Sequence, residues 1–152
     1  MWFSRKQVAK SLPDQAGLDS GQREASQSTT KRLGDAAESL ALAHLLKAGL
    51  KRVQTNYRTP GRGGGEVDLI MRECDGTLVF VEVRQRSGSL HGGAGASIGA
   101  VKQRRIIFAA RHYLMRFSSL PPCRFDVVLV QGALAGPEGV AIEWLREAFD
   151  AG

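Results

Sequence analysis

The sequence predicts a mixed α/β fold, in which helices pack on the faces of a central sheet. Two stretches have the apolar spacing of helices, and shorter runs rich in Val, Ile, Leu and Phe are typical of strands. Their order along the chain is one helix, three strands, a second helix and one or two further strands. The 152 residues are enough for one domain with a substantial core. This order of elements favours a sheet covered by helices.

A polar segment precedes the first predicted helix. Residues 1–29 are rich in Gln, Ser, Asp and Lys and show no clear periodicity, so we interpret them as a disordered extension. The domain is then residues 30–152. Its first helix covers residues 30–48, because a threonine can cap its start and Gly49 can end it in a left-handed conformation.

One acid interrupts the apolar face of this helix. Glu38 shares that face with Gly34, Ala37 and Ala41, at positions i, i+3, i+4 and i+7. A glutamate on such a stripe either reaches solvent at its edge or has a function. The pattern alone does not separate these two interpretations.

The other elements follow in order. The strands are bounded by glycine, proline and polar residues, and we place them at residues 51–58, 65–72, 77–85, 124–130 and 140–144, with a short helical turn after the last. The second helix begins at Ser97 or Gly99 and runs to about Phe117. Two glycine-rich connections, residues 60–65 and 87–99, are expected to be flexible, and the longer one is placed to close over a substrate or to act as a tether.

Two carboxylates occupy the predicted hairpin. Asp68 lies in a run of Val, Leu and Ile, and Glu82 lies in a run of Val and Phe. Acids are costly to bury in such strands, and two like charges facing each other across a sheet cost more. A divalent cation between them, with basic residues nearby to hold a phosphate, is the simplest way to make this arrangement favourable.

The length of the hairpin loop decides whether the two acids meet, because successive side chains point to opposite faces of a strand. A two-residue loop at Asp75 and Gly76 would place Asp68 opposite Val83. A three-residue loop that starts at Cys74, or a five-residue loop over residues 73–77, would instead place Asp68 opposite Glu82. The three-residue form needs glycine at its left-handed position, which Gly76 supplies.

Charge and composition indicate the partner and the compartment. The formal net charge is +6 and the sequence pI is about 9.8, which favours an anionic partner, with nucleic acid first. Cys74 and Cys123 lack metal-ligand spacing and are typical of a reduced, cytoplasmic protein. No apolar run of about 18 residues and no signal peptide is found, so we expect no membrane association.

Several motifs occur together and in a fixed order. They are Gly34-x-x-Ala37-Glu38-x-x-Ala41, Asn56-Tyr57-Arg58, Gly65-Glu66-Val67-Asp68-Leu69-Ile70, Phe80-Val81-Glu82-Val83-Arg84-x-Arg86, Lys102 and Arg124-Phe125-Asp126-Val127. From roughly residue 31 to the end, the chain resembles the YraN family of bacterial proteins. That family is similar to Holliday-junction resolvases in the restriction-endonuclease-like superfamily. The resemblance implies this fold, an endonuclease acting on DNA, possible roles in DNA repair or recombination, and action as a homodimer.

The resemblance also implies an active site. The superfamily has an acid on its first helix, an Asp on one strand and Glu-x-Lys on the next, which become Glu38, Asp68 and Glu82-Val83-Arg84 here. Arg84 therefore stands where the superfamily has lysine. Arginine cannot lose its proton, but it can clamp a phosphate. Lys102 is a candidate substitute base, because its helical stripe, shared with Ile106, Ala109 and Tyr113, is expected to face the sheet.

These roles give a specific mechanistic expectation. Asp68 and Glu82 would hold Mg²⁺ or Mn²⁺ with the Val83 carbonyl, Glu38 would orient the metal or a water, and Gln85 would orient a water or contact DNA. Exposed arginines would contact the DNA backbone, although each singly is more often a solvated charge. They are Arg58, Arg62, Arg86, Arg104 and Arg105.

Two other interpretations compete with the nuclease. In one, the chain is a nucleic-acid-binding or partner-binding module that has this fold without turnover, which the arginine at position 84 favours. In the other, Glu82 only forms a structural ion pair with Arg84, Arg86 or Lys102, which leaves Asp68 and Glu38 unexplained. For Asp126 we favour a structural ion pair with Arg124, the alternative being a place near the site.

Overall fold

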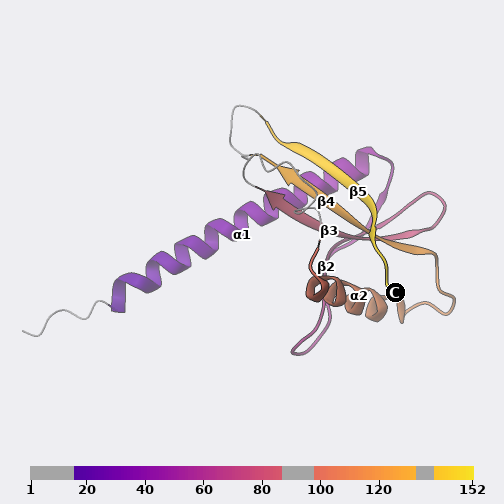
Figure 1. The fold of residues 1–152 in the computed structure, drawn as a ribbon, viewed down its shortest axis with the longest axis horizontal. Coiled ribbons are helices and arrows are strands. Elements are labelled where there is room, and N and C mark those ends of the chain that lie inside the picture. The colour runs from indigo at the N-terminus through magenta and orange to yellow at the C-terminus, as the bar shows by residue number, and fades with distance from the viewer. Residues whose placement is uncertain (1–15, 87–97, 133–138) are drawn as a thin grey trace, which may run out of the picture. The chain divides into compact units, whose positions relative to one another are not determined.

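In the residues that it describes, the computed structural model has two helices and one five-stranded mixed sheet, which confirms the mixed α/β class (Figure 1). It describes residues 16–86, 98–132 and 139–152, with side chains from residue 24 onward. The chain divides into two units, Met1–Arg32 and Leu33–Gly152, and the whole sheet belongs to the second.

The elements occur in the predicted order. They are α1 (Ala16–Lys47), β1 (Lys51–Arg58), β2 (Glu66–Arg72), β3 (Leu78–Arg86), α2 (Ala100–Leu114), β4 (Cys123–Gln131) and β5 (Ala141–Phe149). The first four strands lie within a few residues of their predicted positions. None of the described helices is both long and apolar enough to cross a membrane.

Two predicted boundaries were wrong. Residues 16–29, which we interpreted as disordered, lie within α1, and residues 1–15 of the same segment lie outside the described residues. Side chains 24–32 of α1 are exposed, so this part of the helix buries no apolar face and left no periodic signal in the sequence. At the other end, β5 continues to Phe149 in place of the predicted helical turn. Most of the predicted loop over residues 87–99 lies outside the described residues.

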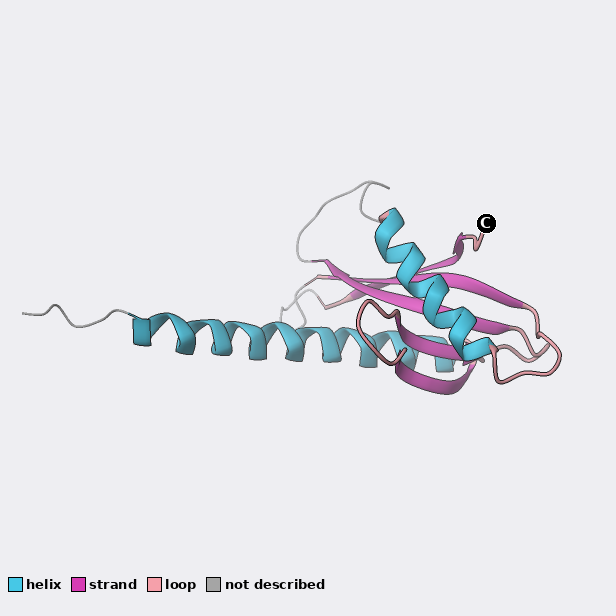
Figure 2. Cartoon of the chain, turned by 90° about the horizontal axis from the view of Figure 1, so that it is seen from below, coloured by secondary structure: helices cyan, strands magenta, loops and turns pink. Residues whose placement is uncertain are grey.

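The strand order in the sheet is β1-β2-β3-β4-β5. The first three strands form an antiparallel meander, β4 runs parallel to β3, and β5 is antiparallel to β4. Parallel neighbours cannot be joined by a tight turn, and the connection between β3 and β4 contains α2. Figure 2 shows α2 lying across one face of the sheet.

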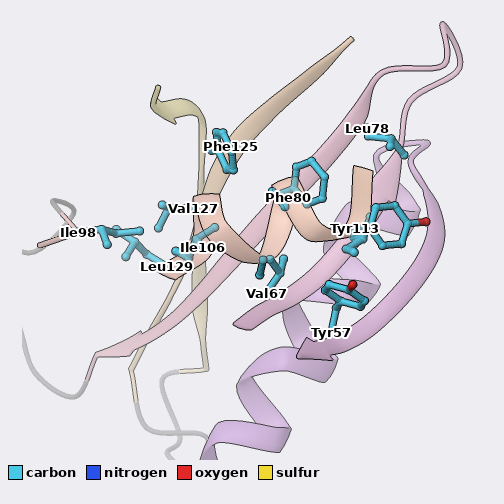
Figure 3. Packing of buried hydrophobic residues seen from close by; sticks show 13 residues of the cluster. Tyr57, Val67, Leu78, Phe80, Ile98, Ile106, Tyr113, Phe125, Val127 and Leu129 are labelled. Carbon is cyan, nitrogen blue, oxygen red and sulfur yellow. The ribbon is translucent and has the colours of Figure 1, made fainter. Parts of the chain in front are cut away.

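Each face of the sheet has its own core. On one face, Ile106, Ala109 and Tyr113 of α2 pack with Phe80 and other buried residues, many of which are labelled in Figure 3. This confirms that the predicted stripe of α2 faces the sheet. On the other face, buried α1 residues such as Ala41 pack against strand residues of β2, β3 and β4. The sheet is therefore buried on both sides, as expected for strands that read as continuous apolar runs.

The predicted ion pair of Asp126 is present and belongs to a larger network. Asp126 is fully buried, and its carboxylate accepts hydrogen bonds from Arg124 Nε at 3.0 and 3.2 Å. It also accepts from Trp144 Nε1 at 2.9 Å and from the backbone amide of Glu147 at 3.0 Å. Arg124 reaches further, to Glu73 Oε1 at 2.7 Å. The network joins β4 and β5 to the β2–β3 loop and takes no part in the site described below.

Candidate functional site

The hairpin register brings Asp68 and Glu82 together. Leu69 pairs with Val81 and the register continues without a shift to Arg72, so Asp68 lies opposite Glu82. The connection covers residues 73–77, and Glu73 and Thr77 remain bonded across it by an N–H···O contact of 2.9 Å. Gly76 has a φ of 93°, the left-handed conformation that the turn requires. The predicted odd-length loop is confirmed.

The two carboxylates lie where the β2–β3 ladder ends. Beyond the Leu69–Val81 pair, the Asp68 Oδ2 atom takes the place of a backbone carbonyl and accepts the Val83 amide at 2.8 Å. Val67 packs on the α2 face of the sheet and Leu69 on the α1 face, so the alternation of β2 is broken at Asp68. The carboxylate of Asp68 is thereby turned into the gap between the strands, beside Glu82.

Lys102 completes this group from α2. Its Nζ lies 3.4 Å from Glu82 Oε1, which is one of the three ion pairs that the structural interpretation of Glu82 allowed. The second oxygen, Glu82 Oε2, is buried and accepts no hydrogen bond from any described residue. Lys102 contacts only one of the two oxygens, and the other side-chain contact of Glu82 is a hydrogen bond with Asp68, which requires a proton on one of the two acids.

Burial shifts the titration of both acids. Burial, followed by the negative charge of Asp68, raises the pKa of Glu82 to about 8, and Lys102 only partly opposes these effects. Burial also raises the pKa of Asp68, against the stabilising hydrogen bond from the Val83 amide. The pair therefore favours a state with fewer than two negative charges near neutral pH, unless a further cation joins it.

The raised pKa of Glu82 predicts that the chain becomes less stable as pH rises. Without divalent ions, the folded chain keeps a proton on Glu82 that the unfolded chain has already released above its ordinary pKa. The resulting stabilisation is complete below that ordinary value and is lost as pH rises through about 8. Glu82→Gln should therefore lose less unfolding free energy than wild type between about pH 5 and pH 8. Denaturant titrations in EDTA at both pH values measure this, and equal losses in the two proteins would contradict it.

Glu38 approaches the pair from α1 but stays apart from it. Burial raises the pKa of Glu38, the negative charge of Asp68 adds to the rise, and a hydrogen bond with Asn56 opposes it. Within residues 16–86, 98–132 and 139–152, no group of three or more His, Cys, Asp or Glu side chains is arranged to hold a metal ion. Glu38 is thus an electrostatic neighbour of Asp68, and the closest contacts of the site are those of Asp68, Glu82 and Lys102.

Asn56 was part of a motif in the sequence analysis, which gave it no role in the site. It lies on β1 between the Thr55–Leu69 and Tyr57–Val67 pairs, directly opposite Asp68, and it bonds Glu38. Its φ is 50°, a conformation that asparagine tolerates better than most residues. An asparagine inside a predicted strand, directly before the Tyr57 core residue, was the available signal.

The remaining residues of the Glu-x-Lys-like segment are divided between the two faces of β3. Arg84 is half-buried and, by alternation, shares the face of Glu82. Gln85 is on the opposite face, with Val83, which packs against the α1 side of the core. The structure thus places Arg84 on the side of the acids and Gln85 away from them. The Val83 amide, whose carbonyl was the predicted ligand, is bonded to Asp68.

The five arginines that were predicted to contact the DNA backbone do not form one cluster. Arg58 and Arg105 line the same hollow of about 330 Å³, together with Lys102 and the 59–65 loop. Arg62 and Arg104 are exposed outside that lining, and Arg86 is half-buried at the end of β3. Only two of the five arginines therefore share a surface with Lys102.

The 59–65 loop is held tightly at both ends. The Thr59 amide bonds the Gly65 carbonyl at 3.0 Å, and the buried Thr59 hydroxyl accepts the Gly65 amide at 2.7 Å. Gly65 also packs directly on the backbone of α2, where an added Cβ would lie 2.0 Å from the Arg105 carbonyl oxygen. The Gly65 end of the loop predicted to be flexible is thus packed on α2, the helix that presents Lys102 to Glu82.

Gly65→Ala is expected to destabilise the fold by about 1–3 kcal/mol, the usual range for forcing an atom into a packed interior. The obstacle is the helix backbone at Arg105 and Ala109, which cannot rotate away. Gly34→Ala is the matched control, because a Cβ there meets no atom within 4 Å and alanine favours the helix. Thermal unfolding of both variants measures the effect. A Gly65→Ala variant as stable as Gly34→Ala would contradict the close packing.

Comparison with known proteins identifies a family that matches most of the motifs described in the sequence analysis. Residues 37–130 match the uncharacterised protein family UPF0102. A UPF0102 protein of Polaromonas naphthalenivorans is 67% identical over 153 residues, which cover 99% of each chain. A UPF0102 protein of Paracidovorax citrulli is 63% identical over 128 residues, covering 84% of this chain and 90% of its own. The matched region contains Glu38, Asp68, Glu82 and Lys102, and the chain belongs to the UPF0102 family.

Proposed function

We propose that the chain is a metal-dependent nuclease that hydrolyses phosphodiester bonds in DNA, including branched or structured DNA. The observation behind this proposal is the pair of buried carboxylates, Asp68 and Glu82, side by side at the end of a ladder with Lys102 beside them. A fold gains no stability from such a pair, because burial and mutual repulsion both oppose its ionised form. A functional requirement for two clustered acids explains why the chain has them. Together with the resemblance to resolvases, this supports a restriction-endonuclease-like site.

The residues present fit a hard divalent cation. Mg²⁺ prefers oxygen ligands and is usually held by one or two carboxylates, with waters and substrate phosphates completing its shell. Asp68 and Glu82 supply two carboxylates, and the buried Glu82 Oε2 atom has no donor among the described residues. These two residues would hold Mg²⁺ or Mn²⁺, with the Val83 carbonyl as a further candidate ligand. Such an ion, when bound, lowers the pKa of a water and polarises the scissile phosphate.

The neighbouring residues have separate roles in this proposal. Lys102 lies next to Glu82, so it supplies the ammonium group that the superfamily places at position 84. As an ammonium it is available to hold a phosphate oxygen, and it could take a proton from the attacking water only as the neutral amine. Arg84, on the same face of β3, stabilises the charge that develops on the phosphoryl oxygens. Glu38 acts through its charge and through Asn56, from the other side of Asp68.

A second candidate function is a nucleic-acid-binding module without turnover. The arginine at position 84, which cannot act as a base, favours it. The purely structural interpretation is weaker. The ion pair of Glu82 with Lys102 is present, but it accounts neither for Glu82 Oε2 nor for the placement of Asp68.

A cleavage assay separates the candidates. The wild-type chain is incubated with branched, flapped, duplex and single-stranded DNA, with Mg²⁺, with Mn²⁺ or with EDTA. Cleavage that needs a divalent ion supports the nuclease. Salt-sensitive binding without cleavage of any of these substrates supports the module, and the absence of both binding and cleavage would leave the net charge of +6 unexplained and the proposal wrong.

A further inference from the structure

A hollow lies beside the acid pair, between the 59–65 loop and α2. Its volume is about 330 Å³, and it is lined by Arg58, Lys102, Arg105, Glu66 and loop residues. Lys102 belongs to both places, since it lines the hollow and its Nζ is 3.4 Å from Glu82 Oε1. The hollow and the acid pair are therefore neighbours, with Lys102 at their boundary.

Positive charge is in excess around this hollow. Three cationic side chains and one acid line it. Glu66 accepts a long contact of 3.4 Å from Arg58 Nη2, whose side chain is 71% exposed, and such an exposed pair is weak. Arg105 forms no ion pair with any acid in the described part of the chain. Of the three cations, Arg105 is therefore the one that an entering anion would meet without a competing acid among the described residues, while Arg58 is only weakly paired and Lys102 is paired with Glu82.

The loop side of the hollow is built of glycine. Gly61, Gly63, Gly64 and Gly65 all line it, so no side chain of theirs projects into the space. At Gly64 a Cβ would lie 2.1 Å from the Thr59 hydroxyl oxygen, and at Gly65 it would meet α2. Gly61 and Gly63 have φ values of 89° and 72°, a region that glycine enters without strain. A loop without side chains opposite three cations suits a small, highly charged group such as phosphate.

We propose that this hollow is a phosphate subsite, which binds a phosphate of the nucleic-acid strand next to the phosphate at the acid pair. The inference rests on the proposed function, because it takes nucleic acid as the ligand. Arg105 is the main anion-binding group of the subsite, Arg58 assists it, and Lys102 is shared between the subsite and Glu82. The strand is thereby held on the α2 side of the acids.

The test is equilibrium binding of fluorescent DNA in EDTA, over a range of salt concentrations, so that no cleavage occurs. Arg105→Gln is expected to weaken binding about tenfold, the usual effect of losing a charged hydrogen bond. It should also lower the slope of log affinity against log salt by about 0.7 to 0.9, the value of one phosphate contact. Arg72→Gln is the matched control, because Arg72 is exposed at the far end of β2 and its loss removes the same charge. Circular dichroism of both variants checks that they fold.

DNA strands with a 5′-phosphate, a 3′-phosphate or neither distinguish the source of the phosphate. If Arg105→Gln loses affinity only for a strand with one type of phosphorylated end, the subsite binds a terminal phosphate. If the variant loses the same affinity for all three strands, the subsite binds an internal phosphodiester. Equal weakening by Arg105→Gln and Arg72→Gln, or no DNA binding by wild type, would overturn the subsite. Cleavage with Mg²⁺ is scored separately: a chain that shows the Arg105 effect but never cuts DNA loses the nuclease proposal and keeps the subsite.

Discussion

Asp68→Asn is expected to abolish metal-dependent DNA cleavage while leaving the chain folded. Asparagine has the size of aspartate, and its amide oxygen can still accept the Val83 amide that Asp68 Oδ2 now accepts at 2.8 Å. Only the negative charge is lost. A metal site deprived of one of two carboxylates loses several kcal/mol of stabilisation in the transition state, which corresponds to a rate reduction of about a thousandfold or more. Initial rates with Mg²⁺ and Mn²⁺ on the best wild-type substrate measure this.

The same variant has a second readout that does not depend on cleavage. The negative charge of Asp68 contributes to the raised pKa of Glu82, so Asp68→Asn should lower that pKa. Titration of the Glu82 carboxyl by NMR reports the change. Asp150→Asn, at an exposed position near the C-terminus, is the control for the Asp-to-Asn change itself. If Asp68→Asn keeps wild-type cleavage, the acid pair is not the metal site.

Asp126→Ala is expected to destabilise the fold by about 3–5 kcal/mol, the typical cost of breaking a buried ion pair by removing one partner. Asp126 is fully buried and is the common acceptor for Arg124, Trp144 and the Glu147 amide. Its removal leaves the Arg124 Nε, Trp144 Nε1 and Glu147 amide donors without this acceptor, although the Arg124 guanidinium keeps Glu73, and it opens a cavity between β4 and β5. Denaturant-induced unfolding measures the loss.

Glu73→Gln is the matched comparison for Asp126→Ala, because it perturbs the same network at its exposed end. Glu73 contacts only Arg124 in that network, and its side chain is 23% exposed. The loss should therefore stay within about 1 kcal/mol, as for partly exposed pairs. Two variants of equal stability would show that the network is not centred on Asp126.

The sequence predicted the features that depend on local patterns. The sheet strands were visible as runs of β-branched and aromatic residues, and the stripe of α2 correctly placed Lys102 toward the sheet. An odd number of residues in the hairpin loop, together with a glycine at position 76, predicted that Asp68 and Glu82 lie opposite each other. Each of these features depends on the spacing of side chains along a helix or strand, or on one residue that must adopt a left-handed conformation. Both can be recognised directly in a sequence.

Other features depend on contacts between distant segments and left no such pattern. The stretch of α1 over residues 24–32 buries no apolar face, and the last part of β5 is bonded to β4 through the Glu147 amide and Asp126. The role of Asn56 follows from its place opposite Asp68 and from its bond to Glu38, which lies on another element. The glycines of the 59–65 loop predicted flexibility, but contact with α2 fastens that loop.

The hairpin loop also limits how this chain can vary over evolution. Residues 73–77 lie at the opposite end of the hairpin from the acids, yet they fix which residue of β3 faces Asp68. Insertion or deletion of one residue that left the five-residue turn intact would shift the pairing by one position and turn Glu82 to the other face, while every residue of the site stayed the same. Changes of two residues keep the acids together. In descendants that keep the site, loop length is therefore free to drift only in steps of two, unless a bulge elsewhere in the hairpin restores the register.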